Sequence, residues 1–182
     1  MSGNPSKGRK DWILRIMATA AVVAWMVVIF LMSADDGNDS GRKSDKVVKV
    51  VFDAAVKVGI LEKEDVTPEL REKAGFIVRK GAHMAEYAIL AVLLMLALTS
   101  WGVTRIAVRA GIAVPIAALY AASDEYHQLS VSGRSGQWRD VGIDLCGVIV
   151  GAGLTAFTMF LVRRKRAKTR NASENVTKPT AE

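Results

Sequence analysis

Apolar residues are gathered into four blocks, and charged stretches separate the blocks from one another. The blocks cover residues 12–32, 76–101, 106–123 and 141–162. A helix needs about 20 mostly apolar residues to cross the hydrocarbon core of a bilayer, and each block is near that length. Pro115 lies inside the third block, where a membrane helix tolerates it because neighbouring groups satisfy the freed backbone. The pattern predicts an all-α fold, a four-helix integral membrane bundle.

The first block could also belong to a secretory signal peptide, because basic residues precede it. A signal peptide has a shorter apolar region, of about 7–15 residues, followed by a small-residue cleavage site. The first block exceeds that length, and Met32-Ser33-Ala34 is a poor cleavage site. We interpret 12–32 as an uncleaved anchor.

Lysine and arginine flank the apolar blocks unevenly, and this bias predicts how the spans are oriented in the membrane. Basic residues precede the first span, occupy the loop between the second and third spans, and follow the fourth. With four spans, these three segments share one side, which the positive-inside rule assigns to the cytoplasm. Residues 1–11 are then a basic cytoplasmic segment, 12–162 the membrane domain, and 163–182 a basic, disordered cytoplasmic tail.

Charge and composition narrow the function classes. The formal net charge is +7, and the basic tail is expected to contact anionic lipid. Nucleic acid is not an expected partner, because no aromatic stacking platform accompanies the charge. Cys146 is the single cysteine, which excludes an intramolecular disulfide and a CxxC site. Acid–base and metal schemes are limited to His83, His127 and carboxylates.

The loop over 33–75, extracytoplasmic in this topology, is predicted to contain an amphipathic helix around 44–58. Apolar residues recur there at helical spacing, with charged residues between them: Val47, Val50, Val51, Ala54 and Val58. Thr67 followed by Pro68 predicts a second helix that leads into the second span. The amphipathic helix is expected either to pack as a lid on the outer face or to lie on the membrane surface.

Ionisable residues also occur inside the predicted spans, where they are costly unless paired or hydrated. They share helix faces: Arg79 with His83 and Glu86 on the second span, and Asp140 with Asp144 on the fourth. In this topology all of them lie toward the extracytoplasmic ends of the spans. The predicted polar cluster, with residues at the end of the third span and in the following turn, is Arg79, Lys80, His83, Glu86, Tyr87, Asp124, Glu125, Gln128, Arg134, Asp140 and Asp144.

Two features of the fourth span and its approach bear on this cluster. Gly147 and Gly151 form a small-xxx-small pattern, which permits a partner helix to approach closely and meet Asp140 and Asp144. Arg134 lies in a glycine-flanked turn, and its planar guanidinium suits either Asp140 or a ligand phosphate.

These motifs, in this order, resemble the VanZ-like membrane proteins. The resemblance rests on Arg79-Lys80-x-x-His83-x-x-Glu86-Tyr87, Ser123-Asp124-Glu125-x-x-Gln128, Gly133-Arg134 and Asp140-x-x-x-Asp144-x-x-Gly147-x-x-x-Gly151. It covers about 12–155, and the sequence departs from it at Met84 and Ser132 without losing a charged group. The resemblance implies a multi-pass protein of a bacterial cell membrane. It also implies a link to the cell envelope, because the family's namesake is associated with resistance to teicoplanin.

Three functions are open from the sequence. The polar cluster could bind an anionic envelope lipid or a cell-wall precursor, with basic side chains facing phosphate. It could instead perform acid–base chemistry through His83 and Glu86 or, with His127 and Asp144, hold a divalent metal. Its charges could also pair with one another and only fix the bundle. Transport is less favoured for two reasons. Four spans are few for a transporter, and the sequence has no paired set of broken helices. The sequence leaves cofactor, substrate and oligomeric state open.

Overall fold

The computed structural model of the chain describes residues 5–34, 37–129 and 138–176. They form five α-helices and one short 3-10 helix, and no strand occurs in these three ranges. The elements are α1 (Pro5–Ser33), α2 (Gly37–Lys57), η1 (Lys63–Asp65), α3 (Pro68–Ser100), α4 (Ile106–Gln128) and α5 (Trp138–Val176). The predicted all-α fold is therefore confirmed.

Four of these helices are long and apolar enough to cross a membrane: α1, α3, α4 and α5. They correspond to the four predicted spans, and their apolar side chains are largely exposed on the protein surface, as lipid-facing residues are. The chain is a multi-pass membrane protein. The amphipathic segment between the first two spans is also helical, and it begins earlier than predicted, at Gly37.

The start of α3 follows the predicted local chemistry. The Thr67 side chain accepts a hydrogen bond from the Leu70 backbone N–H at 3.2 Å, and Pro68 occupies the first turn. A hydroxyl cap satisfies an N–H group that the helix itself leaves unpaired. One continuous helix therefore begins outside the predicted second span and carries its charged first turns into the bundle.

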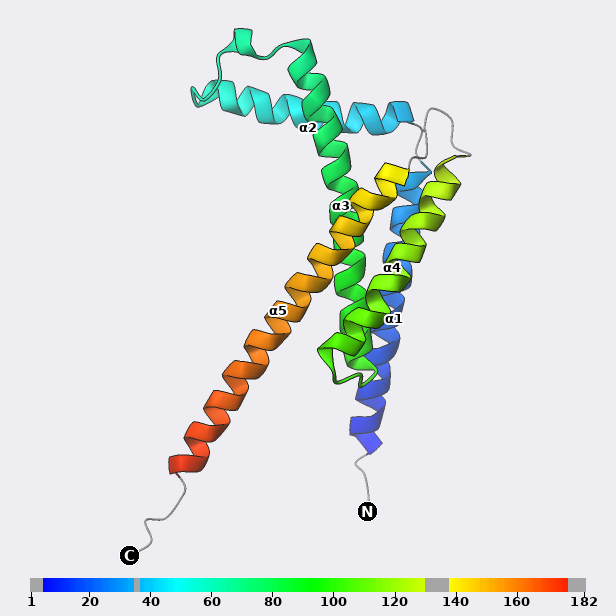
Figure 1. The fold of residues 1–182 in the computed structure, drawn as a ribbon, viewed down its shortest axis with the longest axis vertical. Helices are drawn as coiled ribbons and strands as arrows, with labels where there is room; N and C mark the ends of the chain where they lie inside the picture. The colour runs from blue at the N-terminus through cyan, green and yellow to red at the C-terminus, as the bar shows by residue number, and fades with distance from the viewer. Residues whose placement is uncertain (1–4, 35–36, 130–137, 177–182) are drawn as a thin grey trace, which may run out of the picture.

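Figure 1 shows α3 at the centre of the molecule, with α2 lying across its first turns. α3 contacts α1, α2, α4 and α5, and α4 also packs against α5. The start of α1 and the end of α5 lie at one end of the bundle, which we call the terminal end (Figure 1). The opposite end, where α2 lies, is called the α2 end.

The core is formed where these helices meet α3. Leu90, Ala91 and Met95 of α3 are fully buried, together with three alanines of α4 at four-residue spacing: Ala113, Ala117 and Ala121. Residues four apart lie on one helix face, and a face of alanines lets neighbouring backbones approach. Packing of small side chains therefore holds the bundle without a thick apolar core.

α5 approaches α3 most closely at the two glycines that the sequence identified. A Cβ atom placed on Gly147 would lie 2.1 Å from the Met84 carbonyl oxygen, and one on Gly151 would lie 2.2 Å from that of Ala88. Both distances are far inside van der Waals contact. The small-xxx-small pattern therefore does bring α5 against α3, and it does so next to the turns that carry the charged residues.

The end of the chain differs from the predicted disordered tail. α5 continues without interruption to Val176, well beyond the apolar block. Residues 163–176 contain no glycine or proline and are rich in lysine, arginine and alanine, which have high helix propensity. Reading the loss of hydrophobicity as the end of the helix was wrong, because the backbone does not need an apolar environment to continue helically.

Candidate functional site

Polar and charged side chains are buried together at the α2 end of the bundle, where α1 and α4 end and α5 begins. The buried set contains Ser33 of α1, Glu86 of α3, Asp144 of α5, and three residues of the last turns of α4: Asp124, Glu125 and Gln128. α4 continues five residues past the predicted third span, which brings its polar end into this set. Four helices thus contribute to one polar cluster.

Lys80 and Asp140 connect α3 to α5 through an ion pair. Their side chains are partly exposed, 24% for Lys80 and 19% for Asp140, so the pair lies at the rim of the cluster. The pair is one instance of the charge pairing within the cluster that the sequence left open. It is made possible by the close approach of α5 to α3 at the neighbouring glycines.

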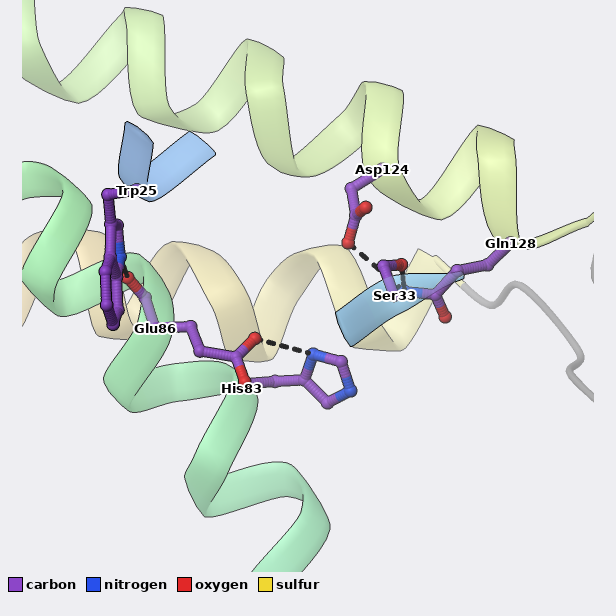
Figure 2. Close-up of polar contacts among 6 residues, drawn as sticks. All are labelled: Trp25, Ser33, His83, Glu86, Asp124 and Gln128. Carbon is purple, nitrogen blue, oxygen red and sulfur yellow. Dashed lines mark hydrogen bonds and ion pairs between the residues drawn. The ribbon is translucent and has the colours of Figure 1, made fainter. Parts of the chain in front are cut away.

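His83 and Glu86 lie one turn apart on α3, with His83 Nδ1 3.6 Å from Glu86 Oε2. Figure 2 shows the imidazole and the carboxylate turned toward each other. This distance is longer than a hydrogen bond but allows an electrostatic interaction when the imidazole is protonated. These are the two side chains that the sequence analysis considered for acid–base chemistry.

Hydrogen bonds and a stacking contact join the end of α1 to the end of α4. Gln128 Nε2 donates to Ser33 Oγ at 2.7 Å and to Asp124 Oδ2 at 3.2 Å, and all three side chains are buried (Figure 2). Phe30 of α1 stacks on His127 of α4 with ring centroids 4.5 Å apart. These contacts hold the last turn of α1 against the last turn of α4 and fix one wall of the cluster.

Trp25 supports the cluster from the middle of α1. Its indole Nε1–H donates to the backbone carbonyl oxygen of Glu86 at 2.9 Å (Figure 2). At the next residue of α1, the Met26 carbonyl oxygen accepts a hydrogen bond from the Tyr120 hydroxyl of α4 at 2.6 Å. Trp25 is half-buried and packs against the core. Its indole N–H, which needs an acceptor when buried, was the signal in the sequence for a polar partner.

Several polar atoms of the cluster can form more hydrogen bonds than the described part of the chain supplies. The Tyr87 hydroxyl, Asp124 Oδ1 and His127 Nε2 are buried and have no well-formed hydrogen bond within the described ranges, although the Tyr87 hydroxyl lies close enough to the Asp124 carboxyl to interact with it. Tyr87 is fully buried, and the carboxyl groups of Asp124 and Asp144 both act on it electrostatically. Buried polar atoms normally bond to protein, water or ligand. These three are therefore positions at which a bound molecule or water would be held.

Asp144 is the most deeply buried acid, with 2% of its surface exposed. Four other carboxyl groups of the cluster act on it electrostatically: Glu125, Asp124, Asp140 and Glu86. Acids gathered in this way repel one another, and the repulsion grows in a medium of low dielectric constant. The arrangement therefore depends on cations or bound protons to balance its charge.

One predicted member, Arg79, stands apart from the buried set. Arg79 Nη1 donates to Ser44 Oγ of α2 at 3.1 Å, so its guanidinium ties α3 to α2. Arg134 lies outside the described residues. Ser33, Ser44 and Trp25 are polar contributors that the sequence-based cluster did not include, because their partners are remote in the chain.

The structure brings no three His, Cys, Asp or Glu side chains of the described ranges into a group suited to a metal ion. The four donors considered from the sequence, His83, Glu86, His127 and Asp144, do not form such a group. The described geometry instead suits hydrogen bonding and charge pairing with a polar molecule at the α2 end. Apart from this cluster, the buried guanidinium of Arg109 lies near the terminal end and donates to the Val103 carbonyl oxygen at 2.5 Å.

The fold and the site define a class: a small polytopic helical membrane protein with charged side chains converging at one end of its bundle. The sequence model of the VanZ/LLP1 family matches residues 18–161, which include all of α3 and α4 and parts of α1 and α5. The chain belongs to this family, as the sequence motifs indicated. No curated protein and no solved structure matches the chain.

Proposed function

We propose that the polar cluster binds the anionic headgroup of an envelope lipid or of a lipid-linked cell-wall precursor. The observation that carries the proposal is the burial of Glu86, Asp124 and Asp144 at the end of a membrane bundle, beneath a rim that contains Lys80. Charged side chains inside a membrane are costly, and they generally face a polar pathway or ligand. A lipid in the same leaflet reaches such a rim directly.

Basic side chains at the rim are the groups that would bind a phosphate. Lys80 of α3 lies at the rim, and Arg139 is exposed at the first turn of α5. An ammonium or guanidinium group makes short charge-assisted hydrogen bonds to phosphate oxygens. The acids behind them fix the cations and would receive hydroxyl or ammonium groups of the same headgroup. Tyr87 and Asp124 supply buried polar atoms for such contacts.

The proposed orientation places the α2 end outside the cell and both termini in the cytoplasm of a bacterium. Basic residues of the chain favour it: they lie in the first turns of α1, between α3 and α4, and along the last turns of α5. All three segments lie at the terminal end, and the positive-inside rule assigns such an end to the cytoplasm. The polar cluster would then open to the extracytoplasmic leaflet.

Native mass spectrometry of the protein extracted from its own membranes tests the binding proposal. Wild type is expected to retain an anionic lipid or precursor, and Lys80→Ala to lose most of it. Lys80→Arg keeps the charge and is expected to retain the ligand. Lys73→Ala is the matched control, because Lys73 lies on the same helix but pairs with Glu69 in an exposed position.

The same experiment separates binding from a purely structural role of the charges. Bare protein in every sample, with Lys80→Ala reduced in folded yield, would mean that Lys80 and Asp140 only hold α3 against α5. Equal ligand retention in wild type and Lys80→Ala would overturn the assignment of Lys80 to the headgroup. Circular dichroism of each variant establishes that the helices are intact.

We further propose that precursor binding alters susceptibility to teicoplanin-type glycopeptides. Such drugs act on cell-wall precursors at the cell surface, so a membrane protein that holds these precursors there would compete with the drug. Family membership supports this proposal. Isogenic strains with wild type, with Lys80→Ala and without the protein should differ in the inhibitory concentration of teicoplanin, with the variant matching the deletion. Identical values in all three strains would overturn it.

Acid–base catalysis is the second candidate, and the approach of His83 to Glu86 favours it. A carboxylate beside an imidazole can orient it and stabilise its protonated form during proton transfer. Turnover of a lipid-linked substrate by purified protein, abolished in His83→Ala and strongly reduced in Glu86→Gln, would establish this function. Turnover that survives His83→Ala would refute the acid–base mechanism.

A further inference from the structure

Apart from its charged side, α2 has two further sides. One of these two packs against α3, and the other is exposed. Ser44 and Val48 of α2 are buried at the crossing with α3, where the side chains of Asp45 and Ser44 lie next to Gly75. A Cβ atom on Gly75 would already contact Asp45 and Ser44 at 3.5 Å and 3.9 Å. Together with the Arg79–Ser44 hydrogen bond, these contacts fix α2 against α3.

The second side is an exposed apolar stripe. Val47, Val50 and Val51 are 49%, 68% and 56% exposed, and Val58 and Ile60 continue the stripe past the end of the helix. At about 100° per residue, the centre of the stripe lies roughly 100° away from the side that contacts α3. For a helix lying across α3, the stripe therefore faces along the α3 axis, either toward the membrane bundle or in the opposite direction, rather than directly away from α3.

The length of α3 sets the height at which α2 crosses it. Gly75 and Trp101 are separated by 26 residues, which corresponds to roughly 39 Å of helix. Trp101 forms an edge-to-face pair with Trp12 at the terminal end, where an interfacial aromatic belt is expected. A hydrocarbon core of about 30 Å, with headgroup layers extending it to about 40–45 Å, then places α2 at headgroup depth.

The polar part of α2 completes the pattern of an interfacial helix. Lys46 and Lys57 border the valine stripe on the side remote from α3, and Lys49 lies on the opposite side of the helix from Val47. Helices that lie in the membrane interface combine an apolar face with lysine-rich polar positions. Lysines at this depth are attracted to anionic lipid headgroups.

From these placements we propose that α2 is an interfacial helix whose valine stripe, Val47, Val50 and Val51, inserts among the lipids at the α2 end of the bundle, with its lysines on anionic headgroups. The occupant of the stripe is the bilayer surface itself. This surface is separate from the headgroup site of the polar cluster, so either proposal can fail without the other.

Depth-dependent fluorescence quenching tests the placement on the full-length protein. Cys146→Ala removes the native thiol, and single cysteines at Val47, Val50 or Lys49 are labelled with an environment-sensitive nitrobenzoxadiazole dye. The proteins are reconstituted in vesicles of phosphatidylcholine and phosphatidylglycerol at a ratio of 3 to 1. Nitroxides at the headgroup or at a shallow acyl position quench from inside the bilayer, and iodide quenches from water.

Val47→Cys and Val50→Cys are expected to be quenched several-fold more by the shallow acyl nitroxide than Lys49→Cys, which iodide should quench instead. Lys49 is a matched control because it lies on the same helix at the same height. Two exposed valine positions keep the test decisive if one variant folds poorly. Stronger iodide quenching at both valines would overturn the proposal and favour a lid raised above the membrane.

Two further outcomes would also overturn it. Valine probes shielded from iodide and from lipid nitroxides alike would indicate that protein, such as a second copy of the chain, covers the stripe. Equal nitroxide quenching in vesicles with and without phosphatidylglycerol would overturn the part of the proposal that assigns the lysines to anionic headgroups. The proposal expects stronger quenching when phosphatidylglycerol is present.

Discussion

Replacing Gly147 by alanine tests the close approach of α5 to α3. The new methyl carbon would lie 2.1 Å from the Met84 carbonyl oxygen, whereas ordinary contact begins near 3.4 Å. The obstructing carbonyl oxygen belongs to the backbone and cannot rotate away. The two helices must therefore separate locally by about 1.3 Å. Even a gap of about 0.5–1 Å removes about a quarter to a half of each dispersion contact. Overpacking of this kind costs about 1–3 kcal/mol.

The unfolding free energy in detergent, measured by titration with sodium dodecyl sulfate and followed by circular dichroism, should fall by that amount for Gly147→Ala. Gly151→Ala should behave in the same way, because its Cβ atom would lie 2.2 Å from the Ala88 carbonyl oxygen. Gly153→Ala is the control on the same helix, since no atom lies within 4 Å of its Cβ position. Equal stability of Gly147→Ala and Gly153→Ala would refute the packing argument.

Three further predictions concern the polar contacts. A double-mutant cycle of Lys80→Ala and Asp140→Ala should give a favourable coupling energy of roughly 0.5–3 kcal/mol, and a value of zero would mean that the pair makes no net contribution. Gln128→Leu leaves the buried Asp124 carboxylate with one partner fewer and should cost about 1–3 kcal/mol in the same unfolding assay, whereas an unchanged value would show that water replaces the amide. Tyr120→Phe removes one hydrogen bond to the α1 backbone and should lower the unfolding free energy by only about 0.6 kcal/mol, the average for such bonds in membranes. A loss above about 2 kcal/mol would require a different role for the hydroxyl.

The membrane helices could be predicted from the sequence because the bilayer imposes a length and a composition on each of them. Their number, approximate bounds and polar faces follow from the apolar blocks and from helical periodicity. The helix start at Thr67 and the close approach at Gly147 also follow from local chemistry. The end of α5 did not, because hydrophobicity reports the membrane boundary and says little about where a charged helix stops.

The candidate site was predictable as a set of residues but not as a set of contacts. A charged residue inside a span is conspicuous in the sequence, so Lys80, His83 and Asp144 were identified directly. The partners supplied by α1 were not, because Ser33 and Trp25 are ordinary residues of an apolar helix until another helix is packed against them.

The sequence alone determined that the chain forms four membrane helices and that polar residues cluster near the ends of three of them, because both properties depend on residues close together in the chain. Only the tertiary structure decided which groups meet: Lys80 with Asp140, Gln128 with Ser33, and α2 with the first turns of α3. The physical reason is that a helix fixes which residues share a face but leaves its rotation and partners to packing. Here that packing is set by small residues that let the backbones touch.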